Sequence, residues 1–179
     1  MSFEVYEKLL ILIASWFQPD QYIAPKSIKR ILDQMADSIL KLLIVRGHVD
    51  AQLFQDVESL RNHDKPSRLQ LAILNLANDY LRNEGYVGNR NDYYNADNSY
   101  INKIFQTKLG IPISLSILYL CLVGRFGIVV KPINFPRHFL VRWEDETKGE
   151  AGNLAEAYYI DIFRKLLLHF ITPSHIITV

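Results

Sequence analysis

Residues 98–143 read NSYINKIFQTKLGIPISLSILYLCLVGRFGIVVKPINFPRHFLVRW, and this stretch decides the fold. The segment Ile111–Phe126 carries apolar side chains on every face of a helix, which predicts a helix buried on all sides. Pro112 lies in its first turn, where proline is tolerated because the missing N–H would have no partner within the helix. A β-type run, Ile128–Phe135, follows, and a second strand is expected to begin at His138. A buried helix leading into two strands is typical of a domain that mixes helices and sheet.

Four helices are predicted before this stretch, from the spacing of apolar residues and from start and stop signals. Ser27 is expected to cap the second helix and Asp50 the third, because their side-chain oxygens can accept hydrogen bonds from the free N–H groups of a first turn. The four helices are expected at Phe3–Phe17, at Ile28–Val45, at Ala51–Leu60, and from Pro66 to about Asn83.

The segment Gly85–Asp97 differs from its surroundings, since it is rich in Asn, Gly and Tyr and has no periodicity. Such a loop is expected to be ordered by hydrogen bonds from Asn and Asp side chains to the backbone. An ordinary long connection is the alternative that the spacing alone favours. Asn98 or Ser99 is expected to cap the short helix that reaches Lys108.

With 179 residues, the chain is expected to form a single domain, and it is long enough to bury a substantial core. The predicted fold class is α+β, with a helical N-terminal layer and a small antiparallel sheet packed on the buried helix Ile111–Phe126. The C-terminal end is apolar, and it either supplies a last core element or belongs to a truncated product. The expected parts are a helical layer at 1–84, an ordered loop at 85–97, the core helix and strands at 98–163, and an apolar tail at 164–179.

Charge and cysteine content argue against several classes of function. Charged residues make up 22% of the chain and the formal net charge is +1, so no long-range field favours nucleic acid or a membrane surface. The single cysteine, Cys121, cannot form an internal disulfide, and the start of the chain is unlike a signal peptide. Both features predict a reducing compartment, the cytoplasm or the nucleus. The histidines lack the spacing of a metal site, so neither a metal nor another cofactor is expected.

Short motifs follow one another in a fixed order between Phe3 and Phe163. They are Gly88–Asn89, Asp92–Tyr94, Asn98–Tyr100, Gly110–Ser116, Tyr119–Leu120, Gly127, Asn134–Pro136, His138–Leu140 and Ile160–Asp161. In this order and spacing they resemble the transglutaminase-like superfamily, whose fold is transglutaminase- or papain-like, and specifically its SirB-type branch. The N-terminal segment Ala14–Asp20 is most similar to the copy of this domain found in F-box-only proteins.

The resemblance implies a set of site residues. In active members of the superfamily a Cys opens the buried helix and attacks an acyl carbon, a His on the next strand acts as its base, and an Asp orients the His. The resemblance places Pro112 at the Cys position and matches His138 and Asp161 to the other two. Proline carries no nucleophile, so His138 and Asp161 are interpreted as a remnant pair. They are expected on neighbouring strands within hydrogen-bonding distance, close to the first turn of the Pro112 helix.

Three other side chains are candidate replacement nucleophiles. Cys121 lies nine residues beyond Pro112, about half a turn away in angle and ~13 Å along the axis, so it is expected to be an inert, buried packing residue. Ser114 lies in the first turn of the helix, and Ser116 lies one turn below Pro112 on the same face. A serine nucleophile needs a base within reach and an oxyanion hole, so capping or packing is the favoured role of both serines.

Two hypotheses for the function follow from these residues. The first, based on Pro112, is a non-catalytic transglutaminase-like module that binds another protein. By resemblance it belongs to an F-box-type ubiquitin-ligase adaptor, with ubiquitin-ligase components among its partners. The alternative is a cysteine or serine hydrolase or acyltransferase that uses Cys121, Ser114 or Ser116 together with His138 and Asp161.

Overall fold

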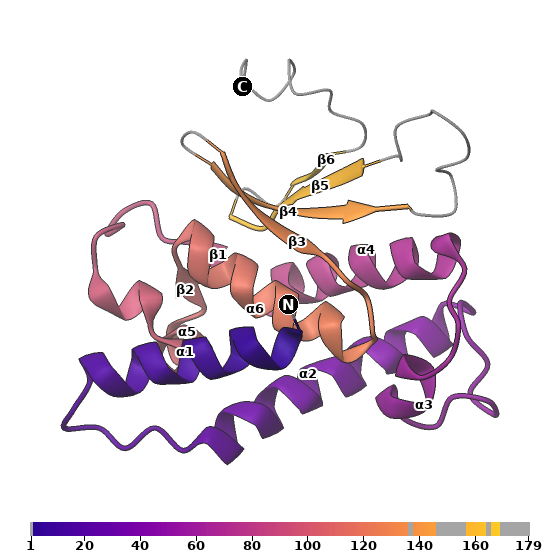
Figure 1. Ribbon diagram of the computed structural model, residues 1–179, viewed down its shortest axis with the longest axis horizontal. Coiled ribbons are helices and arrows are strands. Elements are labelled where there is room, and N and C mark those ends of the chain that lie inside the picture. The colour runs from indigo at the N-terminus through magenta and orange to yellow at the C-terminus, as the bar shows by residue number, and fades with distance from the viewer. Residues whose placement is uncertain (1, 136–137, 146–156, 164–165, 169–179) are drawn as a thin grey trace.

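A computed structural model describes residues 2–135, 138–145, 157–163 and 166–168 of the protein. A layer of helices packs on one side of a central helix, and a small sheet packs on the other (Figure 1). This arrangement confirms the predicted α+β fold class. The helices are α1 (Phe3–Phe17), α2 (Pro25–Val45), α3 (Val57–Arg61), α4 (Ser67–Asn83), the 3-10 helix η1 (Ala96–Ser99), α5 (Ile101–Thr107) and α6 (Pro112–Arg125). The strands are β1 (Val87–Gly88), β2 (Leu109–Gly110), β3 (Lys131–Phe135), β4 (His138–Glu144), β5 (Ala157–Asp161) and β6 (Leu166–Leu168).

Helix α6 is the centre of the hydrophobic core. From Ser114 to Arg125 every residue except Ile117 is buried, which confirms the prediction of a helix enclosed on all sides. Helices α1, α2 and α4 contact it from the helical layer, and β4 contacts it from the sheet. The Tyr119 hydroxyl donates a hydrogen bond of 2.9 Å to the carbonyl of Leu74, so this large side chain is buried without leaving a polar atom unpaired.

The larger sheet has the strand order β3–β4–β5–β6, and every pairing in it is antiparallel. Val141 of β4 lies opposite Ile160 of β5, and both belong to the hydrophobic core together with Trp143. A second, two-stranded sheet pairs β1 with β2 in parallel. Strand β1 lies within the segment that the sequence predicts as loop, and β2 follows the helix predicted to reach Lys108. Two-residue strands are too short to leave a periodic signal.

A buried cation joins three of the helices. Arg125 of α6 lies 2.6 Å from the carboxylate of Glu7 on α1 and 2.8 Å from that of Asp33 on α2, and its Nη1 donates to the Cys121 carbonyl at 2.8 Å. The Arg125 side chain is only 6% exposed, so it is desolvated but fully paired. Loss of one partner of such a pair typically costs about 3–5 kcal/mol, because it leaves a buried charge uncompensated.

Two predicted helix starts are wrong. Helix α2 begins at Pro25 rather than Ile28, because proline fits the first helical position and Ser27 makes no cap. Helix α3 begins at Val57 rather than Ala51. The Asp50 carboxylate accepts a hydrogen bond from the N–H of Gln52 and closes a turn instead. The cap of α3 is formed by Asp56, whose carboxylate accepts a hydrogen bond from the Ser59 N–H.

Two further boundaries differ from those predicted. Neither Asn98 nor Ser99 caps α5, because both belong to η1 and the N-cap of α5 is Tyr100, which makes no side-chain cap. Strand β3 begins at Lys131, three residues later than the β-type run. Of the apolar tail 164–179, only β6 is described; it adds a fourth strand to the sheet, and the rest of the tail lies outside the described residues.

Candidate functional site

Helix α6 begins where β2, η1 and α1 come together. Pro112 is the first helical residue. The Ser114 Oγ accepts a hydrogen bond of 3.1 Å from the Ile111 N–H and donates one of 2.6 Å to the Asn98 carbonyl. These bonds satisfy an N–H group at the helix start and hold the first turn of α6 against η1.

The loop that precedes η1 is organised by a buried asparagine. Asn98 is 3% exposed, and its Nδ2 donates to the carbonyls of Asp92 at 2.7 Å and Tyr93 at 3.2 Å. Its Oδ1 accepts from the Nδ2 of Asn89 at 3.0 Å, and Asn95 donates to the Asp92 carboxylate at 2.8 Å. The prediction that Asn and Asp side chains order this loop is confirmed.

The same loop touches the end of β5. A Cβ on Gly88 would lie 2.2 Å from the ring of Phe163, so no residue larger than glycine fits without displacing that ring. The guanidinium of Arg90 lies 5.8 Å from the centre of the Phe163 ring, and the Tyr93 ring lies edge-on at 6.3 Å. Since Phe163 follows Asp161 by two residues, the loop lies beside the carboxyl end of β5.

Two of the residues matched by resemblance belong to neighbouring strands. His138 begins β4 and Asp161 ends β5, and extension of the printed register by one residue places Leu140 opposite Asp161. Asp161 is 4% exposed. The side chain of His138 lies outside the described residues, so the hydrogen bond between His138 and Asp161 stays a prediction.

The two serines at the start of α6 are in different environments. The Ser114 hydroxyl is held by its bonds to Ile111 and Asn98, which is the geometry of a capping residue. Ser116 is 0% exposed, and its Oγ has no hydrogen-bond partner within the described part of the chain. Neither hydroxyl combines access to solvent with freedom to transfer its proton, and a nucleophile needs both.

Cys121 is buried, as expected. It is 0% exposed, and its Sγ lies 4.0 Å from the carbonyl of Phe3 on α1. Burial raises the pKa of the Cys121 thiol to about 12, because the thiolate is poorly solvated there. A thiol in this state is protonated at neutral pH and is a poor nucleophile.

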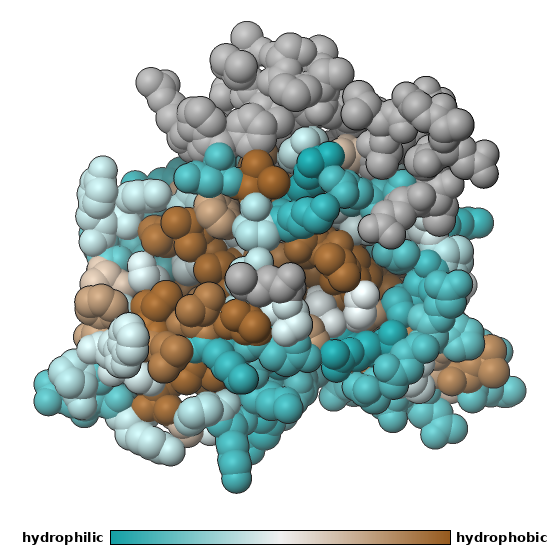
Figure 2. All heavy atoms as spheres, in the orientation of Figure 1, coloured by the Kyte–Doolittle hydropathy of each residue, from teal (hydrophilic) through white to brown (hydrophobic). Residues whose placement is uncertain are grey.

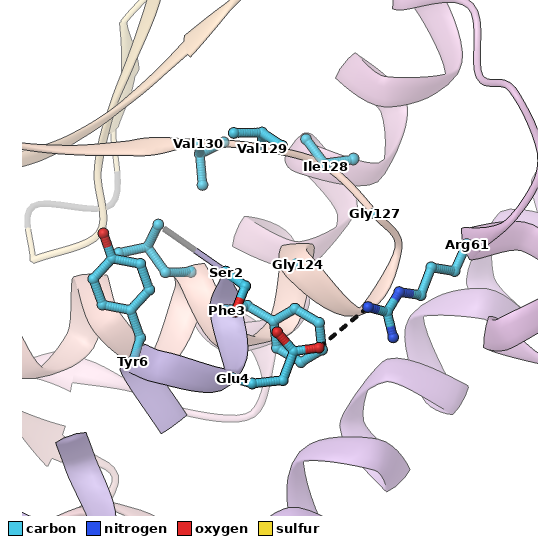
Figure 3. Close-up of a pocket in the computed structure, with 11 residues that line it drawn as sticks. Ser2, Phe3, Glu4, Tyr6, Arg61, Gly124, Gly127, Ile128, Val129 and Val130 are labelled. Atoms are coloured by element: carbon cyan, nitrogen blue, oxygen red, sulfur yellow. Dashed lines mark hydrogen bonds and ion pairs between the residues drawn. The ribbon is translucent and has the colours of Figure 1, made fainter. Parts of the chain in front are cut away.

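Residues of α1 line several hollows, two of which lie against α6. The first has a volume of about 370 Å³ and an apolar lining, and it lies beside the first two turns of α6, between Ile113, Ile117 and Phe17. The second, shown in Figure 3, has a volume of about 190 Å³ and lies under the segment that follows α6. Arg61 reaches across this second hollow to Glu4, with 3.2 Å between the charged atoms. None of the predicted site residues lines the second hollow.

Neither a metal cluster nor a membrane-spanning helix occurs among the described residues. No group of three or more His, Cys, Asp and Glu side chains in the described ranges is arranged to hold a metal ion. Among the same residues, no helix has both the length and the hydropathy needed to cross a membrane.

Residues 47–168 match the transglutaminase-like superfamily, and the match contains α6, both sheets and all the candidate site residues. The chain therefore belongs to the transglutaminase-like superfamily. It is similar to human F-box only protein 21, with 32% identity over 166 residues that cover 92% of this chain and 26% of the human protein. A UPF0162 protein of Xylella fastidiosa is 38% identical over 110 residues, which cover 56% of this chain and 39% of the bacterial protein. No solved structure matches the chain.

The chain spans only about a quarter of the length of its F-box relative. The similarity to F-box only protein 21 nevertheless covers 92% of this chain, so it includes residues that precede the family match at residue 47. It agrees with the resemblance of the N-terminal segment to the domain copy in F-box-only proteins.

Several structural residues of the site were missed or misassigned from sequence. The sequence predicts Asn98 or Ser99 as a helix cap, whereas the Asn98 side chain is the centre of the loop's hydrogen bonds. The contact between Gly88 and Phe163 joins residues far apart in the chain, and no local pattern indicates it. The Asn-rich composition of the loop was the one sequence signal for this part of the site.

Proposed function

We propose that this domain is a non-catalytic member of its superfamily and acts by binding another protein. The observation that supports it is Pro112, the first residue of α6, at the position that the resemblance assigns to the nucleophilic Cys. A proline at this position supplies neither a thiol nor a hydroxyl, yet it suits the first turn of a helix. The fold can therefore persist after the chemistry is lost.

The alternative, a hydrolase or acyltransferase, has less support. Ser114 is held as a capping residue, while Ser116 and Cys121 are buried within α6. An acyl transfer site also needs donors preorganised for the oxyanion and an open groove for the substrate. In this reading His138 and Asp161 are retained because a buried carboxylate needs a partner, whether or not the site is catalytic.

The kind of partner is inferred from the relatives. The similarity to human F-box only protein 21 supports a role within an F-box-type ubiquitin-ligase adaptor, in the cytoplasm or nucleus, with ligase components or their clients as protein partners. The loop of residues 89–95, which precedes η1, is accessible to a partner, since its Tyr94 is 95% exposed. An exposed loop positioned by a rigid scaffold is a common way to present a binding surface.

Restoring the nucleophile tests the proposal. Pro112→Cys places a thiol at the N-terminus of α6, where the helix dipole and free N–H groups lower its pKa. We expect Pro112→Cys to be alkylated faster than the control variant Ile113→Cys, which adds a half-exposed thiol at the next residue. We also expect neither variant to hydrolyse amides or thioesters or to transfer their acyl groups to amines. Acyl transfer by Pro112→Cys that disappears when His138→Ala is added would contradict the proposal, because it would show an otherwise intact site.

The unmodified protein provides the second arm of this test. Fluorophosphonate and iodoacetamide probes are expected to leave the native protein unlabelled. Stoichiometric labelling that His138→Ala abolishes would favour the enzyme hypothesis.

Photo-crosslinking tests the binding surface. A photo-crosslinking residue in place of Tyr94 is expected to capture a partner protein, whereas the same residue in place of Val45, which is also exposed, is expected to capture none. Equal capture at both positions would mean that the loop is not the binding surface.

A further inference from the structure

Helix α1 has a second apolar face that points to solvent. Its residues Leu10 and Ala14 are buried, whereas Val5, Leu9 and Leu12 are 38%, 42% and 44% exposed and Trp16 is 73% exposed. At 100° per residue the four exposed side chains fall within an arc of about 60°, on the side of the helix opposite Leu10 and Ala14. Figure 2 shows hydrophobic side chains gathered over α1 on the face of the molecule turned to the viewer.

The spacing of these four residues is that of a helix–helix seam. We call the set Val5, Leu9, Leu12 and Trp16 the α1 seam; its steps are 4, 3 and 4 residues. Steps of this kind keep every side chain on the line along which two helices pack as in a coiled coil. A surface helix needs only one apolar stripe, which faces the core, so the α1 seam is not explained by the fold of one chain.

The apolar surface continues beyond the seam at both ends. Phe17 is 67% exposed and Ile113 is 48% exposed, and both line the hollow of about 370 Å³. At the other end, Val129 is 72% exposed and lines the hollow of Figure 3 with Phe3 of α1. Apolar patches that extend over several elements in this way mark interaction sites more often than scattered exposed residues do.

The size of this face is close to that of a protein interface. An aromatic side chain presents about 150–250 Å², so Trp16 and Phe17 at their observed exposure leave on the order of 300 Å² uncovered. Seam and flanking residues together approach the ~800 Å² that each partner of a standard interface buries, and the four seam residues alone supply about half of that area. An α1–α1 contact that buries the seam alone is therefore small, of the size of weak, transient interfaces.

The α1 seam is also complementary to itself. A two-fold axis between residues 10 and 11 places Val5 opposite Trp16 and Leu9 opposite Leu12 of an antiparallel second helix. The smallest side chain of the seam then meets the largest, and the two leucines meet each other. We propose that α1 packs against α1 of a second copy of this chain, antiparallel and about that axis. A contact that uses the same patch on both subunits closes as a dimer and leaves no free patch for further growth.

The oligomeric state in solution tests this proposal. Sedimentation velocity over about a hundred-fold range of concentration should show a monomer–dimer equilibrium, since mass action makes such a dimer concentration-dependent. Leu9→Glu and Leu12→Glu, each on the seam, are expected to weaken association at least about ten-fold, because each buries an unpaired carboxylate in the dimer. Val45→Glu is the matched control, because Val45 is 82% exposed on α2, away from the seam, and this variant should dimerise normally.

Folding is checked for each variant by circular dichroism and thermal midpoint, which exposed substitutions should leave nearly unchanged. A wild-type protein that stays monomeric at every concentration would overturn the proposal. The proposal would also be overturned if Leu9→Glu dimerised with the same affinity as the control variant Val45→Glu. If the monomeric protein instead bound a synthetic amphipathic helix with leucine at every seam position, the face would belong to a different partner and the proposal would be wrong.

Cross-linking tests the antiparallel geometry. Val5→Cys mixed with Trp16→Cys, treated with a short bismaleimide, should cross-link more efficiently than Val5→Cys alone. The reason is that two Val5 positions lie about 16 Å apart along an antiparallel pair, at 1.5 Å per residue, whereas Val5 and Trp16 are adjacent. The native Cys121 is buried and does not interfere. Equal cross-linking of Val5→Cys with itself would rule out the antiparallel pairing.

Discussion

Ser114 and Ser116 lie two residues apart on α6, and their hydroxyls differ in hydrogen bonding. The Ser114 Oγ accepts a hydrogen bond from the Ile111 N–H and donates one to the Asn98 carbonyl. The Ser116 Oγ is buried and has no hydrogen-bond partner among the described residues. A buried hydroxyl that makes hydrogen bonds stabilises the fold, and one that makes none does not. The two residues therefore form a natural pair for comparison.

We expect Ser114→Ala to lower the free energy of unfolding by about 1–2 kcal/mol, the usual cost of a lost helix cap. Ser116→Ala is expected to stay within about 0.5 kcal/mol of the unmodified protein, or to stabilise it, since it removes an unpaired polar atom. Urea denaturation of both variants measures the difference. Equal losses would mean that the Ser114 hydrogen bonds do not hold the start of α6, or that Ser116 has a partner.

Pro112 illustrates how one residue can remove chemistry while preserving structure. The N–H of a first-turn residue has no partner in the helix, so proline costs nothing there. In the interior of α6 the same residue would cost about 3 kcal/mol or more. The position that the resemblance assigns to the nucleophile is therefore one where proline is structurally acceptable.

At the scale of elements, the contact between α1 and α6 depends on a glycine. A Cβ on Gly124 would lie 2.3 Å from the Cβ of Phe3, so the first turn of α1 can approach α6 only because residue 124 has no side chain. Phe3 is fixed on its other sides by Arg61 and Arg125, whose guanidinium carbons lie 5.0 Å and 5.3 Å from its ring centre. Phe3 therefore has little room to move away.

We expect Gly124→Ala to destabilise the protein by about 1–3 kcal/mol, the cost typical of an overpacked core. Helix propensity alone predicts the opposite sign, a gain of about 1 kcal/mol for alanine in a helix interior. Chemical denaturation of Gly124→Ala, Phe3→Ala and the double variant measures the coupling. If the close approach is the cause, Gly124→Ala should be far less harmful when Phe3→Ala is already present; strictly additive losses would contradict it.

At the scale of the whole molecule, burial of several weak acids makes stability sensitive to high pH. Burial raises the pKa of Tyr119 well above its ordinary value of 10.0, and it also raises the pKa of Tyr86. Burial raises the pKa of Cys121 from 9.0 to about 12. In each case the unfolded chain loses its proton first, so the unfolded state binds fewer protons than the folded state once the pH exceeds the ordinary pKa values.

The free energy of unfolding is therefore expected to be insensitive to these groups below about pH 9 and to fall as the pH rises from there through their folded pKa values. Tyr119→Phe should reduce the slope above about pH 10, although it also removes the hydrogen bond to the Leu74 carbonyl and so lowers stability at every pH. Tyr22→Phe is the control, because Tyr22 is 88% exposed. Denaturation curves at a series of pH values measure the slopes, and equal slopes for both variants would contradict the assignment to Tyr119.

The sequence by itself determined most of the elements and the central place of α6. The apolar residues between Ile111 and Phe126 cover every face of a helix, and such a helix can only be stable when it is enclosed. The extent of α1, the start of β4 at His138 and the placement of Asp161 on a strand also follow from local pattern, and the structure agrees with them. These features are predictable because periodicity and breaker residues act over a few neighbouring positions.

Only the tertiary structure decided which face of each element is buried and which distant residues are in contact. Periodicity shows that α1 is helical and apolar, but the choice of Leu10 and Ala14 as its buried face depends on which neighbours it meets. The carboxylates that pair with Arg125 come from helices more than ninety residues earlier in the chain. Gly88 and Phe163, which are in contact, are also far apart in the sequence. Contacts of this range leave no periodic trace in sequence, because they are set by how whole elements pack and by which polar groups must be paired once they are buried.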